Sequence, residues 1–226
     1  QVSPMTVPKG PNVWAAEAIK QSVSVPVIAS GSITTPQFAE EILKEKNVDF
    51  VSLGRPLLAD PYFPLKAKEG RPEDIIPCIR CSDGCLERTF FNYQSIRCSV
   101  NPTMGREGEL PITPASAPKN IVVVGGGPAG MEAARVGALR GHKVTLFEKR
   151  KLGGALSVSS ALSFKADLRI LENYYSAQLE KLDINIVHEE ATLETINNGD
   201  FDAAVIAVGK VPKPVQIKGI DPSKVI

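Results

Sequence analysis

Cysteine is absent from this chain outside one segment, residues 78–98, and histidine occurs only twice. Such scarcity argues against a small scaffold held together by disulfides. No apolar run approaches the roughly 18–20 residues that a membrane span needs, so we expect no membrane partner. Neither sign of charge dominates: 26 basic and 25 acidic residues give a net charge of +1, which offers no electrostatic attraction for nucleic acid. The start shows no secretory signal, so we expect a reducing, cytoplasmic location.

The 226 residues suffice for one large domain or two ordinary ones, and the 43% hydrophobic content is typical of a globular protein. The opening, QVSPMTVPKGP, resembles an internal loop, so we expect a piece of a longer polypeptide. The sequence carries no signal for the oligomeric state.

Residues 12–69 alternate between helix and strand patterns. A first predicted helix has apolar side chains near one face: Val13, Trp14, Ala16, Ile19 and Val23. A second predicted helix begins after Thr35, which is its N-cap, with Pro36 at the first helical position. A third predicted helix ends near Gly70. Short apolar runs at 25–30 and 49–54 predict buried strands. Helices between strands predict parallel strands, and thus an α/β fold.

Two such units cannot close a barrel by themselves, which again indicates a longer parent protein. If they are the last two of eight, their loops are the phosphate site that such barrels commonly carry. Gly31 and Gly54 would then expose backbone N–H groups, and Arg55 would offer two hydrogen bonds to a phosphate. Taken alone, Arg55 is equally well explained as a surface or inter-helix salt-bridge residue.

The four cysteines have the spacing C-x2-C-x3-C-x12-C, at Cys78, Cys81, Cys85 and Cys98. Structural zinc more often uses two separated C-x2-C-type pairs. Three thiolates within eight residues and a fourth further on suit a [4Fe–4S] cluster better. Zinc, and unligated thiols or disulfides, remain alternatives.

After a Pro-, Gly- and Ser-containing linker at 108–118 comes a strand, a glycine turn and a helix. Gly125, Gly127 and Gly130 form G-x-G-x-x-G, which lets a dinucleotide pyrophosphate approach the helix N-terminus. The next strand ends at Glu148, where a carboxylate would meet an adenosine ribose and favour FAD or NAD over NADP. Gly154 and the glycine before it could let the chain pass near the cofactor. They are equally well explained as ordinary turn glycines. An empty Rossmann-like scaffold is the other interpretation.

Several stretches together resemble the old yellow enzyme branch of flavin oxidoreductases, which includes 2,4-dienoyl-CoA reductase, enoate reductases and trimethylamine dehydrogenase. These are PVIASGSI, VSLGRPLLADP, CIRCSDGC with CSVNP, GRE, VVVGGGPAGMEAA, GHKVTLFEK and LGG. The resemblance implies that residues 1–70 are the last two βα units of an FMN-binding TIM barrel, which we call the barrel segment. It also implies a [4Fe–4S] cysteine segment at 71–107, and a Rossmann-like FAD domain at 119–226 that is interrupted before a nicotinamide-binding domain.

By the same resemblance, Gly31, Ser32, Gly54 and Arg55 contact the FMN phosphate, and the four cysteines bind the cluster. Gly125, Gly127, Gly130, Glu148 and Gly154 hold FAD. Electrons would pass from NAD(P)H through FAD and the cluster to FMN, which reduces the activated C=C bond of a small-molecule enoate or enoyl-CoA. An amine dehydrogenase and a non-enzymatic, zinc-stabilised nucleotide-binding module are the rivals.

No catalytic acid or base is assigned, because the barrel strands that would carry one are not in this sequence. We expect His142 and His188 to be surface residues, and Tyr174 and Tyr175 to serve in packing.

Overall fold

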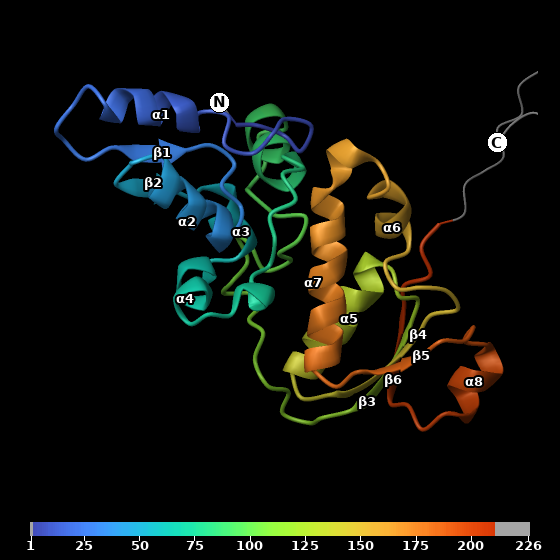
Figure 1. The fold of residues 1–226 in the computed structure, drawn as a ribbon. Helices are drawn as coiled ribbons and strands as arrows, with labels where there is room; N and C mark the ends of the chain where they lie inside the picture. The colour runs from blue at the N-terminus through green and yellow to red at the C-terminus, as the bar shows by residue number, and fades with distance from the viewer. Residues whose placement is uncertain (1, 211–226) are drawn as a thin grey trace, which may run out of the picture.

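The computed structural model describes residues 2–210 and contains two parallel β-sheets (Figure 1). The smaller sheet pairs β1 (Ile28–Ser30) with β2 (Phe50–Ser52). The larger has the order β5–β4–β3–β6, with strands β3 (Asn120–Val124), β4 (Lys143–Phe147), β5 (Asn185–Val187) and β6 (Ala203–Ile206). The predicted α/β class with parallel strands is confirmed. Residues 211–226 of the predicted FAD domain lie outside the described residues.

The barrel segment packs two helices, α1 (Val13–Lys20) and α2 (Pro36–Glu45), around its small sheet. Helix α2 begins as predicted, because the Thr35 hydroxyl accepts a hydrogen bond from the Phe38 N–H at 3.3 Å. Two short helices follow β2, α3 (Arg55–Ala59) and α4 (Phe63–Lys68). Gly70 follows the end of α4 with a φ of 69°, a left-handed conformation that suits glycine.

The first predicted helix and the two predicted strands of this segment differ from the structure in burial. Only Val13 and Ala16 of the helix are buried, whereas Trp14 is 71% and Ile19 54% exposed. Ile28 of β1 and Phe50 of β2 are also more than half exposed. The reason is that, within the described residues, this sheet has only two strands and little covers its outer positions.

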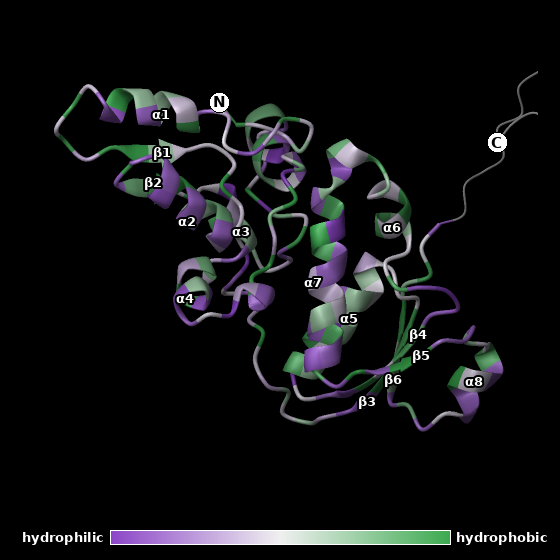
Figure 2. Cartoon of the chain, in the orientation of Figure 1, coloured by the Kyte–Doolittle hydropathy of each residue, from purple (hydrophilic) through white to green (hydrophobic). Residues whose placement is uncertain are grey.

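The larger sheet has helices on both faces: α5 (Pro128–Leu139), α6 (Ala155–Ser159), α7 (Asp167–Lys181) and α8 (Leu193–Asn198). Val123 and Leu146 point to the α5–α7 side, and Val122 and Phe147 to the α8 side. This alternation of side chains along each strand produces two apolar layers. Figure 2 shows hydrophobic residues along the strands and on α5, with hydrophilic residues on the outside of α7.

The cysteine segment lies between the sheets and contains short helical turns, η1 (Pro72–Asp74) and a π-helix, η2 (Asp83–Phe91). Two residues beside cysteines, Ile79 and Val100, belong to the same buried core as α5 and α7. The linker at 108–118 is held against the end of α5, because the Ala115 N–H donates a hydrogen bond to the Arg140 carbonyl at 2.8 Å. The two segments that the linker joins are also in direct contact through the shared core. No helix in the described range combines the length and apolar character that crossing a membrane requires.

Candidate functional site

The four residues predicted to bind the FMN phosphate line one pocket at the ends of β1 and β2. Gly31 and Ser32 follow β1, and Gly54 and Arg55 follow β2. Because the strands are parallel, their carboxyl ends meet at one edge. Gly31 and Ser32 have positive φ angles of 130° and 51°, which bend the chain sharply at this edge.

Arg55 makes contacts that the sequence did not predict. Its guanidinium donates to the Ser32 hydroxyl at 3.0 Å, the Ser3 carbonyl at 2.6 Å and the Ser82 hydroxyl at 2.9 Å. Ser82 lies between two of the cysteines. Arg55 therefore links the barrel segment to the cysteine segment, and within residues 2–210 no carboxylate forms an ion pair with it.

Two buried hydroxyls in this pocket have no partner in the described part of the chain. Ser3 and Thr34 are 2% and 6% exposed, and both line the pocket. A buried hydroxyl without a hydrogen bond is costly. Together with the Arg55 charge, these unpaired groups fit a polar anion such as a phosphate.

All four cysteines line a second pocket beside the first. Leu58, Ile79 and Val100 supply its apolar walls. Arg55 and Cys78 border both pockets, so the predicted phosphate site and the cysteine site share a wall.

The backbone of this segment directs donors at the sulfurs. Arg80 and Ser82 are in the left-handed region, with φ of 52° and 62°. The Arg80 N–H points at the Cys78 sulfur, and the N–H groups of Val100 and Asn101 point at that of Cys98. Hydrogen bonds of this kind stabilise thiolates and iron–sulfur clusters.

Gly84 brings the fourth cysteine back to the other three. Its carbonyl accepts from the Arg97 N–H at 2.8 Å, and a Cβ at Gly84 would come within 2.9 Å of the Arg97 carbonyl oxygen. Only glycine permits this approach, which places Cys98 beside Cys85.

Burial raises the pKa of the Cys78 thiol to about 11 and also raises that of Cys98. These thiols are protonated at neutral pH unless a metal displaces the proton, so they are poor nucleophiles.

All four cysteines are free thiols. Within residues 2–210, no three Cys, His, Asp or Glu side chains are grouped to hold one metal ion. The four free thiols and the apolar walls of this pocket fit a metal centre held by cysteine.

The predicted FAD residues form a third group that lines neither pocket. A Cβ at Gly130 would overlap the Gly125 carbonyl, so the glycine allows helix α5 to start there. The Glu148 carboxylate accepts from the Gly126 N–H at 2.7 Å. Gly154, with φ of 53°, lies against Gly127. The glycine turn, the Glu148 carboxylate and the LGG loop at 152–154 therefore lie together.

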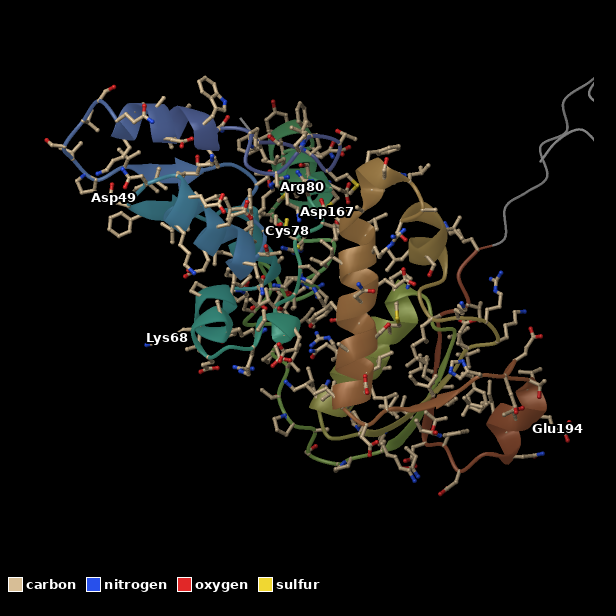
Figure 3. The ribbon with its side chains drawn as sticks, viewed as in Figure 1. Asp49, Lys68, Cys78, Arg80, Asp167 and Glu194 are labelled. Atoms are coloured by element: carbon tan, nitrogen blue, oxygen red, sulfur yellow. The ribbon has the colours of Figure 1, made fainter. Side chains whose placement is uncertain are left out.

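Arg80 and Asp167 are functional candidates that sequence reasoning missed. Their ion pair joins the cysteine segment to α7, with 2.7 Å between Arg80 Nε and Asp167 Oδ2 (Figure 3). No sequence signal pairs them, because they are 87 positions apart.

The remaining histidines and tyrosines behave largely as expected. His188 is exposed, and the half-buried His142 accepts from the Lys119 N–H at 3.1 Å. Tyr174 and Tyr175 are buried in the core, which raises the pKa of both phenols.

Residues 4–74 match the family NADH:flavin oxidoreductase / NADH oxidase, and residues 119–225 match the family pyridine nucleotide-disulphide oxidoreductase. A metal reductase of Desulforamulus reducens is 44% identical over 92% of this chain and 32% of its own length. A cinnamate reductase of Clostridium sporogenes is 39% identical over 96% of this chain and 33% of its own length.

The solved complex of 2-naphthoyl-CoA reductase with 2-naphthoyl-CoA superimposes with a TM-score of 0.88 at 34% identity. The match covers 97% of this chain and 34% of that structure. This chain thus spans about a third of the length of the curated relatives that it matches. Two family matches in this order, and relatives that align along nearly the whole sequence, show that the chain belongs to the NADH:flavin oxidoreductase / NADH oxidase family.

Proposed function

We propose that this chain carries the electron-transfer sites of an NAD(P)H-dependent flavin and iron–sulfur oxidoreductase. The observation that carries the proposal is the shared wall between the two pockets. Arg55 and Cys78 border both the candidate phosphate pocket and the pocket lined by all four cysteines. An iron–sulfur cluster in the cysteine pocket would exchange electrons with a flavin in the neighbouring pocket, whereas a structural zinc would only stabilise the loop.

Each group of residues has a role in this proposal. Arg55, with Gly31, Ser32 and Gly54, binds the FMN phosphate. Cys78, Cys81, Cys85 and Cys98 bind a [4Fe–4S] cluster, and backbone N–H groups orient toward two of the sulfurs. Gly125, Gly127, Gly130, Glu148 and Gly154 bind FAD. When bound, these groups would supply the hydride and one-electron chemistry that protein side chains lack.

We propose as substrate an α,β-unsaturated acid or thioester, whose C=C bond is reduced with electrons from NAD(P)H. The names of two similar proteins support this class, since cinnamate is an unsaturated acid and 2-naphthoyl-CoA an aromatic thioester. Amine oxidation by the same set of cofactors is the alternative.

Composition is the first test. The protein is purified without oxygen and assayed for iron, acid-labile sulfide, zinc and flavin. About four irons and four sulfides per chain are expected for this cluster. A colourless protein that holds zinc and no sulfide would contradict the proposal and support the nucleotide-binding module.

Substrate class is tested on the enzyme that contains this chain. NADH and NADPH oxidation is followed with cinnamate and with an enoyl-CoA. For the rival class, reduction of an artificial electron acceptor is followed with a methylated amine as the electron donor. Turnover of the unsaturated compounds alone is expected. Oxidation of the amine alone would favour the dehydrogenase alternative.

A further inference from the structure

The Arg80–Asp167 ion pair lies where three parts of the chain meet. Arg80 is between Cys78 and Cys81, and Asp167 is the first residue of α7 in the predicted FAD domain. Both side chains are 5% exposed. In Figure 3, Arg80, Asp167 and Cys78 lie close together beside the N-terminal end of α7.

The polar atoms of this pair are largely occupied. Arg80 Nε donates to Asp167 Oδ2 at 2.7 Å, and its terminal nitrogens donate to the carbonyls of Val7 at 2.6 Å and Met5 at 3.3 Å. Lys9 lies 3.3 Å from Asp167 Oδ1. A buried arginine held at this many points has little freedom to change its orientation.

The same residue also contributes to the cysteine site through its backbone. Arg80 has a φ of 52°, an unfavourable conformation for a residue with a Cβ. In this conformation its N–H points at the Cys78 sulfur. The side-chain contacts of Arg80 therefore hold the backbone geometry that aims a donor at one of the candidate cluster ligands.

We infer that Asp167, acting through Arg80, is a positioning residue for the iron–sulfur cluster: it fixes the cysteine segment on α7 and keeps the Arg80 N–H directed at Cys78. The inference rests on the proposed cluster. It assigns to the predicted FAD domain a direct part in holding a cluster whose ligands all lie outside that domain.

The chain offers a matched control at the other end of the same helix. Asp74 in the cysteine segment accepts hydrogen bonds from Gln178 at 3.0 Å and Lys181 at 2.6 Å, both on α7. Asp74 is as well buried as Asp167, at 7% and 5% exposed. Among the residues that the structure describes, the side-chain hydrogen bonds of Asp74 go to Arg71, Gln178 and Lys181, none of which is a cysteine or next to one. Asp74 therefore joins the same segments away from the cluster site.

The test compares Asp167→Asn with Asp74→Asn in the iron-loaded protein. Asp167→Asn should lose its visible cluster absorbance about tenfold faster under an iron chelator, the change expected when roughly one hydrogen bond is lost. The EPR spectrum of its reduced cluster should also shift. Although Asp74→Asn also lowers the stability of the fold, its reduced cluster should keep the wild-type EPR spectrum, because the residues around Arg80 are unchanged.

Equal chelation rates and spectra for the two variants would overturn the inference while leaving the proposed function intact. If the wild-type protein itself contains no iron and sulfide, the proposed function fails, and the inference fails with it. If Asp167→Asn does not fold, Asp167→Glu keeps the charge but shifts the carboxylate. It should show the same spectral change in smaller degree, and an unchanged spectrum would count against the inference.

Discussion

Gly127 and Gly130 belong to the same turn but have different surroundings. A Cβ at Gly130 would overlap the Gly125 carbonyl, whereas a Cβ at Gly127 meets nothing within 4 Å. The space above Gly127 is needed only if a pyrophosphate approaches the backbone there. We therefore expect Gly130→Ala to lower the free energy of unfolding by about 1–3 kcal/mol, because overpacking forces the backbone to move.

Gly127→Ala should leave unfolding nearly unchanged and yet weaken FAD binding at least about tenfold, because the added methyl group occupies the approach of the pyrophosphate. Urea denaturation and FAD titration of the two variants measure the two effects separately. Full FAD affinity in Gly127→Ala would show that the turn does not hold the dinucleotide as proposed.

Asp74 predicts a pH dependence of stability. Burial pushes the pKa of its carboxyl upward, but hydrogen bonds from Lys181, Gln178 and Arg71 outweigh burial and hold the pKa at about 2. A carboxyl with a lowered pKa stabilises the fold above its unfolded value and loses that effect as the pH falls through the folded value. The shift from 3.8 to about 2 corresponds to roughly 2 kcal/mol.

The unfolding free energies of the wild type and Asp74→Asn should therefore differ by about 2 kcal/mol at pH 7. The difference should shrink between about pH 4 and pH 2, the window set by the unfolded and folded pKa values. Denaturation curves at several pH values measure it. A gap that keeps its full size down to pH 2 would mean that the carboxyl is not held by these hydrogen bonds.

Among the elements, helix α2 has the clearest start signal. The Thr35 hydroxyl caps the helix at the Phe38 N–H, and Pro36 takes the first helical position. Thr35→Ala should cost about 1 kcal/mol of stability, while Thr35→Ser, which keeps the hydroxyl, should cost only a few tenths. Thermal or chemical denaturation of the pair checks this. Equal losses would show that the methyl group, not the cap, stabilises the site.

Elements with strong local signals could be predicted from sequence, and elements that depend on distant packing could not. The cap at Thr35 and the glycine turn at Gly125 are encoded within a few residues, and the structure contains both elements. The burial of Trp14 and Phe50 depends on which elements cover them, so an apolar pattern alone predicted it wrongly. The contacts of Arg55 and Arg80 cross 27 and 87 positions respectively and leave no periodic signal.

Across the whole molecule, the cysteine segment and the large sheet share one core. Ile79 packs with residues of α5 and α7, although 108–118 looks like a linker that would keep the sites independent. A linker that is predicted from composition marks an irregular part of the chain. Composition does not predict whether the segments on either side of it are in contact. Substitutions in the cysteine segment should therefore differ in their effect on FAD according to whether they reach this core.

Cys81 and Ile79 provide that comparison, because they are two positions apart and only Ile79 is buried in the core. Cys81→Ser should remove the iron and sulfide while FAD content and stability stay close to the wild type. Ile79→Ala should cost about 2–4 kcal/mol, since it leaves a cavity beside α5 and α7, and should lower FAD retention as well. Iron, sulfide and FAD per chain, with a denaturation curve, distinguish the two. Loss of FAD in Cys81→Ser to the same extent would mean that the glycine turn depends on the cluster itself and not only on the core that they share.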